Sequence, residues 1–161
     1  MVMIVIGFAA SFGYMMTLMQ VPAKVTGFLL QLTDNKYAIL MLINIMLLVL
    51  GTFMEWIAIV FITVPVFAPV VMTLAPELGL TEDQAKIWFG ILFVMNIQIY
   101  FLSPPFGPAC FWLKSVAPKD VTLQEIFVSV LPFIVLQIIG LVLVMMFPQI
   151  ALWLPQYVYA R

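Results

Sequence analysis

Residues 101–111, FLSPPFGPACF, gather a hydroxyl and three prolines in an otherwise apolar run. Proline has no amide hydrogen, and its ring clashes with the preceding helical turn, so Pro104, Pro105 and Pro108 remove donors and free carbonyls upstream. Freed carbonyls and the Ser103 hydroxyl are hard oxygen ligands that can replace the water around an alkali cation. A helix resuming beyond the break would offer free N–H groups and a positive dipole end, which suit an anion. The pattern therefore indicates a site for an ion and an anionic solute.

A second group of polar residues lies in LINIMLLVLGTFMEW, residues 42–56. Gly51 and Thr52 favour a tight bend between two half-length helices, 38–50 and 55–72, whose outer ends would emerge on the same side of a membrane. A carboxylate at the centre of a membrane helix costs about 3 kcal/mol on insertion scales. Glu55 therefore belongs either to a re-entrant hairpin or to the membrane surface between two full spans, and both interpretations stay open.

The proline cluster is either a functional break or a kink in an ordinary spanning helix. Unpaired backbone survives in a membrane only where protein or a watery cavity surrounds it, and broken helices are typical of secondary transporters. A cluster that also contains Gly107 favours the functional break. Asn96 and Gln98 precede the break, and Asn96 is the better site candidate of the two. We expect Cys110 to be a small apolar residue beside the break.

The composition excludes several classes of function. The chain has 161 residues, of which 66% are hydrophobic and 8% charged, whereas a soluble domain carries about 25% charged residues. It has no histidine and one cysteine, so the usual general base and nucleophile pairs are missing. A net charge of −1 offers no basic surface for nucleic acid. We predict an all-α integral membrane protein that is not an enzyme.

The charged residues divide the chain into one membrane domain, residues 1–161, with eight expected segments. These are a spanning helix (1–21), an interfacial segment (22–36), a helical hairpin (37–73), a polar loop (74–86), a discontinuous helix (87–116), a link (117–125), a second spanning helix (126–148) and an interfacial tail (149–161). Thr81 is the expected N-cap of one helix, and Thr122 with Glu125 has the form of a capping box for another. The apolar N-terminus leads us to expect a piece of a longer protein.

The chain resembles the large membrane subunit of the tripartite ATP-independent periplasmic (TRAP) transporters. Three stretches carry the resemblance in order: NIMLLVLGTFME, TVPVFAP and FGILFVMNIQIYFLSPPFGPACF. It implies a sodium-driven elevator transporter built of two inverted repeats, of which this chain would supply the second. By this similarity Gly51, Thr52 and Ser103 would hold Na⁺, and the Ser103-Pro104-Pro105-x-Gly107 break would complete one side of the substrate site. No cofactor besides the coupling ion is implied.

The resemblance also implies a location and partners. The protein would be a multi-pass protein of a bacterial inner membrane that imports organic anions, usually carboxylates. Its partners would be the N-terminal remainder of the permease, a small four-helix membrane subunit and a periplasmic substrate-binding protein. The family architecture would place residues 20–36 and 77–86 outside and 114–125 inside, which the distribution of lysines alone leaves open.

Some residues depart from the family pattern. Many members have Thr-Pro-Pro where this chain has Ser103, and Asp where it has Glu55, so a hydroxyl and a carboxylate are retained. Phe111 and Trp112 are bulkier than usual and resemble branches that handle larger or aromatic acids. Two other functions stay open, namely a channel or exporter subunit with the break as its filter, and a structural membrane subunit whose prolines are kinks.

Overall fold

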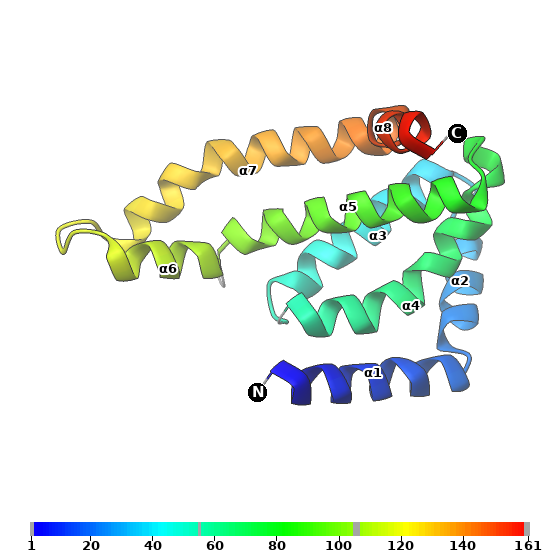
Figure 1. Cartoon of the computed structure of the whole chain (residues 1–161), viewed down its shortest axis with the longest axis horizontal. Helices are drawn as coiled ribbons and strands as arrows, with labels where there is room; N and C mark the ends of the chain where they lie inside the picture. The colour runs from blue at the N-terminus through cyan, green and yellow to red at the C-terminus, as the bar shows by residue number, and fades with distance from the viewer. Residues whose placement is uncertain (1, 55, 105–106, 160–161) are drawn as a thin grey trace.

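The computed structural model describes residues 2–54, 56–104 and 107–159, and all regular elements in these ranges are helices. They are α1 (Val2–Leu18), α2 (Val21–Leu32), α3 (Lys36–Gly51), α4 (Trp56–Leu74), the 3₁₀ turn η1 (Pro76–Leu78), α5 (Glu82–Leu102), α6 (Pro108–Val116), α7 (Leu123–Met146) and α8 (Gln149–Tyr159) (Figure 1). The predicted all-α class is confirmed for this part of the chain. Three helices, α4, α5 and α7, are long and apolar enough to cross a membrane.

Helix α1 ends at Leu18, before the expected boundary at residue 21, and the chain then bends sharply into α2. The two helices meet at 65°, and only together do they pass the length test for a span. Gln20 takes a left-handed conformation at the bend, with φ 56°, and Pro22 follows in the first turn of α2. Proline suits that position because the first amides of a helix have no acceptor within it.

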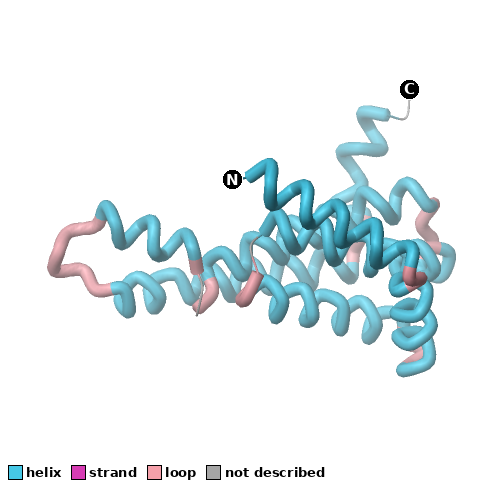
Figure 2. The backbone as a smooth tube through the Cα atoms, turned by 90° about the horizontal axis from the view of Figure 1, so that it is seen from below, coloured by secondary structure: helices cyan, strands magenta, loops and turns pink. Residues whose placement is uncertain are grey.

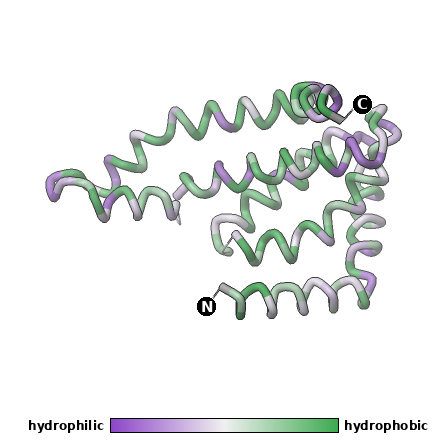
Figure 3. The backbone as a smooth tube through the Cα atoms, viewed as in Figure 1, coloured by the Kyte–Doolittle hydropathy of each residue, from purple (hydrophilic) through white to green (hydrophobic). Residues whose placement is uncertain are grey.

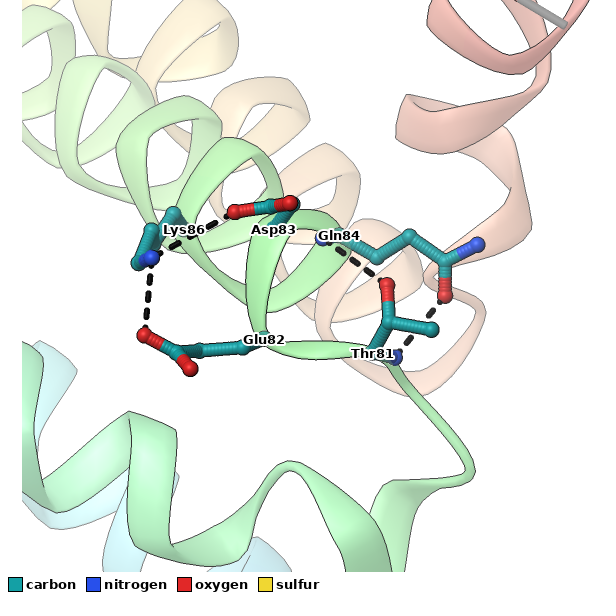
Figure 4. Close-up of polar contacts among 5 residues, drawn as sticks. All are labelled: Thr81, Glu82, Asp83, Gln84 and Lys86. Carbon is teal, nitrogen blue, oxygen red and sulfur yellow. Dashed lines mark hydrogen bonds and ion pairs between the residues drawn. The ribbon is translucent and has the colours of Figure 1, made fainter.

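Side-chain caps explain where two of the long helices begin. The Thr81 hydroxyl accepts from the Gln84 N–H at 3.4 Å, and Gln84 Oε1 accepts from the Thr81 N–H at 3.0 Å (Figure 4). Thr122 and Glu125 make the same reciprocal pair at the start of α7, with distances of 3.2 and 2.7 Å. Both predicted N-caps are therefore confirmed.

Helices α3 and α4 have 16 and 19 residues and form a hairpin, with α3 ending at Gly51 and α4 beginning at Trp56. Helix α3 packs on α5, α4 packs on α1 and α2, and α5 lies beside α7 (Figure 1). The open end of the hairpin faces η1, where the Lys36 ammonium donates to the Glu77 carbonyl. The buried core lies between these helices, and the Trp88 indole donates to the Val144 carbonyl at 2.9 Å across it. The re-entrant form of the hairpin and the full-span form both stay predictions.

The polar segments gather at the two ends of the molecule. The bends near residues 19–20 and 33–35 and the turn η1 lie at one end, and the link 117–122 projects at the other (Figure 2). Hydrophilic residues concentrate at these ends, and the helices between them are mostly apolar (Figure 3). Segments 20–36 and 77–86 thus lie opposite 114–125, as the expected orientation requires. The side of the membrane that each end faces stays a prediction.

Candidate functional site

The tip of the hairpin rests on the end of α5, just before that helix breaks. Gly51 is buried at the last position of α3, and a Cβ atom added there would lie 2.3 Å from Cδ1 and 2.6 Å from Cγ of Tyr100. Only glycine leaves room for that ring. Tyr100 is 3% exposed and lies three residues before Ser103. The structure therefore brings the predicted bend and the predicted break together, although they are far apart in the sequence.

Thr52 follows Gly51 and caps the C-terminus of α3. Its N–H bonds to the carbonyls of Leu48 and Val49, each at 3.2 Å, and its hydroxyl donates to the Val49 carbonyl at 2.7 Å. The hydroxyl oxygen keeps its lone pairs, so it remains a possible cation ligand. Glu55, the other predicted residue of this group, lies outside the described residues.

The predicted break lies between α5 and α6, and Ser103 caps the C-terminus of α5. The Ser103 N–H donates to the Tyr100 carbonyl at 3.1 Å, and its hydroxyl donates to the Ile99 carbonyl at 2.7 Å. The Ser103 carbonyl in turn accepts from the Gly107 N–H at 2.9 Å, which closes a tight loop across the prolines. Ser103 is partly buried and Pro104 exposed, whereas Pro105 lies outside the described residues.

Fewer carbonyls are free at the break than the proline cluster suggests. The Cys110 thiol, expected to act only as a small apolar side chain, donates to the Leu102 carbonyl at 3.6 Å. The amide that would pair with the Phe101 carbonyl in a continuous helix belongs to Pro105 and carries no hydrogen. A carbonyl that already accepts one bond keeps a second lone pair, so the loop retains the oxygen chemistry expected for a cation.

Both the backbone conformation and the space available at position 107 require a glycine. Gly107 is buried, has φ 21°, and a Cβ there would lie 2.7 Å from the Phe127 ring. Its carbonyl accepts from the Cys110 N–H at 2.8 Å, which begins α6. Pro108 has no N–H, and the Phe111 N–H also bonds to the Gly107 carbonyl, at 3.3 Å, so α6 offers the break mainly the positive end of its dipole.

Asn96 lies in the buried interior, seven residues before Ser103, and not at the break itself. It is 1% exposed, and its amide donates to the Asn44 side chain of α3 at 2.5 Å. Asn96 was expected as a site residue, but nothing in the sequence named Asn44 as its partner. The available signal was an amide side chain within the uncharged apolar stretch of each helix.

A cavity of 510 Å³ lies beside the break. It is walled mainly by apolar and aromatic side chains and contains two amides: Trp56, Ile97, Gln98, Phe101, Leu102, Trp112 and Gln137. Trp112 packs edge-on against Phe101 with ring centres 5.4 Å apart, whereas Phe111 packs on Phe127 at 6.1 Å. Of the two bulky residues singled out in the sequence, Trp112 lines this cavity. The contributions of Trp56 and Gln137 were not predicted.

The family model described as "Tripartite ATP-independent periplasmic transporter, DctM component" matches residues 1–150. The chain belongs to this family. The resemblance seen in the hairpin and proline stretches is thereby confirmed, and a TRAP transporter component fits the apolar helices.

Three TRAP permeases illustrate the relationship. The isethionate TRAP transporter permease protein DctMQ of Oleidesulfovibrio alaskensis is 33% identical over 153 residues, 95% of this chain and 22% of that protein. The sialic acid large permease protein SiaM of Vibrio cholerae is 34% identical over 145 residues, 90% of this chain and 32% of its own length. The C4-dicarboxylate large permease protein DctM of Pseudomonas aeruginosa is 31% identical over 159 residues, 98% and 34% respectively. The chain therefore spans only about a fifth to a third of these TRAP relatives.

Proposed function

We infer that this chain is the C-terminal part, the second inverted repeat, of a sodium-coupled TRAP permease that imports an organic acid. The observation that carries this inference is the contact between Gly51 and Tyr100, which places the hairpin tip beside the broken helix. Na⁺ binds oxygens of Gly51, Thr52 and Ser103 and holds the tip and the break together. The loaded half then moves across the membrane as an elevator.

The substrate is an organic anion that binds where α6 begins. The positive end of the α6 dipole is directed at the break, and a helix N-terminus favours a negative group. The relatives are named for isethionate, sialic acid and C4-dicarboxylates, all of which are acids. The cavity beside the break, with Trp112 on its wall, receives the uncharged part of the substrate.

The working transporter contains more than this chain. The N-terminal remainder of the permease supplies the first repeat, a small four-helix membrane subunit supports it, and a periplasmic binding protein delivers the solute. The family description, a tripartite periplasmic transporter, supports such an assembly in a bacterial inner membrane.

Replacing Ser103 with alanine tests the ion site. In the whole permease we expect the sodium concentration for half-maximal uptake to rise about tenfold, the factor that corresponds to 1.4 kcal/mol, because a cation ligand is lost. Ser103→Thr keeps the hydroxyl and should restore the wild-type value. The measurement is a sodium titration of solute uptake into proteoliposomes.

Ser129→Ala is the matched control, because the Ser129 hydroxyl also donates to a carbonyl of its own helix, that of Ile126 at 2.7 Å. It should leave the titration unchanged. An unaltered titration for Ser103→Ala would remove Ser103 from the site.

A further inference from the structure

Two buried amides join the hairpin to the broken helix some distance from the ion site. Asn44 of α3 is 7% exposed and Asn96 of α5 is 1% exposed. They bond through Asn96 Nδ2 and Asn44 Oδ1 at 2.5 Å, and apolar side chains of α3, α5 and α7 surround them. Polar side chains are costly in such a place unless they are paired.

All four N–H groups of the two side-chain amides donate hydrogen bonds. Asn44 donates to the Leu40 carbonyl at 2.7 Å and to the Met145 sulfur of α7 at 3.8 Å. Asn96 donates to the Leu92 carbonyl at 2.9 Å as well as to Asn44. Each amide is thus anchored to its own helix before it reaches the other one, which fixes the direction of the bond between them.

The amide pair and the hairpin tip lie on the same two helices. Asn44 precedes Gly51 by seven residues, two turns of α3, and Asn96 precedes Tyr100 by four residues, about one turn of α5. On both helices the chain therefore runs from the buried amide toward the break. A contact between two apolar side chains tolerates sliding, whereas a directed amide bond specifies one register, as a single buried Asn does in a coiled coil.

We propose that the Asn44–Asn96 pair is a positioning element that fixes the register of the hairpin on the broken helix, so that the tip and the break meet where the ion binds. The effect on the ion rests on the function proposed above. The effect on register does not, and it can be measured without transport.

Register can be read from a disulfide between the tip and α5. The Cβ of Tyr100 is one bond from its Cγ, and Cγ lies 2.6 Å from a Cβ built on Gly51. The two Cβ atoms are therefore no more than about 4 Å apart, within the range that disulfides allow. Gly51→Cys with Tyr100→Cys, in a whole permease whose other cysteines including Cys110 are replaced, should cross-link rapidly under mild oxidation in membranes.

The test adds Asn44→Leu with Asn96→Leu to this background, because replacing both partners leaves no orphaned polar group. We expect cross-linking to slow about tenfold and, in the permease without the introduced cysteines, the half-saturating sodium concentration to rise about tenfold, equivalent to 1.4 kcal/mol. If the double variant does not accumulate in the membrane, Asn96→Ser replaces it. A serine can bond to the Leu92 carbonyl as Thr63 does to Ile59, but it removes the bond between the helices and leaves Asn44 Oδ1 without that donor.

Thr63→Val is the control, since it removes a buried hydroxyl, 2% exposed, whose bond stays within α4. It should change neither the cross-linking rate nor the sodium titration. Wild-type cross-linking in the variant that lacks the amide bond would overturn the proposal. Slowed cross-linking in a permease whose uptake ignores sodium would support the positioning role and contradict the proposed function instead.

Discussion

Replacement of Gly51 by alanine should reduce uptake by the whole permease at least about tenfold, the effect of 1.4 kcal/mol or more. The added Cβ would lie 2.6 Å from Cγ of Tyr100, an atom too close to the backbone to swing aside. Either α3 or α5 must then move, and overpacking of this kind costs about 1–3 kcal/mol. Because the strain falls between the hairpin tip and the broken helix, it should separate the groups that we propose bind the ion. Initial uptake rates at several sodium concentrations measure the effect.

Two companion variants identify the cause. Gly90→Ala lies on the same helix α5, and its Cβ would meet nothing within 4 Å, so uptake should be preserved. Combining Gly51→Ala with Tyr100→Ala removes the ring that the new methyl group meets, and part of the lost uptake should return. Normal uptake by Gly51→Ala alone would show that the close contact has no role in transport.

Converting Pro104 and Pro105 to alanine should strongly reduce uptake without destabilising the permease. The substitution returns N–H donors to the carbonyls of Tyr100 and Phe101 and lets helix continue beyond α5. Each proline is about 3 kcal/mol less favourable than alanine in a helix interior, so the gain in helix should compete with the loop that Ser103 and Gly107 close. We expect uptake to fall more than about tenfold, the effect of 1.4 kcal/mol, while the thermal unfolding temperature stays the same or rises.

Pro132→Ala is the matched control, since Pro132 also lies inside a helix, α7, but is exposed and is not one of the residues of the break. It should leave sodium-dependent uptake intact. If the double alanine variant at Pro104 and Pro105 also transports normally, the prolines act only as kinks, and the break has no part in binding.

Local signals in the sequence were enough to predict much of the fold. Thr81 and Thr122 begin helices because their hydroxyls satisfy first-turn amides, and that chemistry needs only neighbours in the chain. The proline cluster predicted the break for the same reason, since missing amide hydrogens are a covalent property. Gly51 indicated a bend before α4, and the structure has one there.

Contacts between distant segments were beyond such reasoning. Nothing local states that the Tyr100 ring fills the space left by Gly51, or that Asn44 meets Asn96, because each pairing depends on how whole helices pack. The Cys110 bond across the break was missed for a related reason, since a thiol beside apolar residues has no local mark of a donor. The bend at Gln20 also lacks the glycine that usually accompanies a positive φ.

The most direct test of sodium coupling at the hairpin and the break is uptake driven by an imposed gradient. The whole permease, with the small subunit and binding protein proposed for it, is reconstituted in proteoliposomes and given a labelled acid chosen by screening isethionate, sialic acid and C4-dicarboxylates. We expect uptake that saturates with solute, requires an inward sodium gradient, and stops when that gradient is dissipated at the same external sodium concentration. Uptake that proceeds equally without the gradient, or that never saturates, would contradict a sodium-coupled carrier and favour a channel.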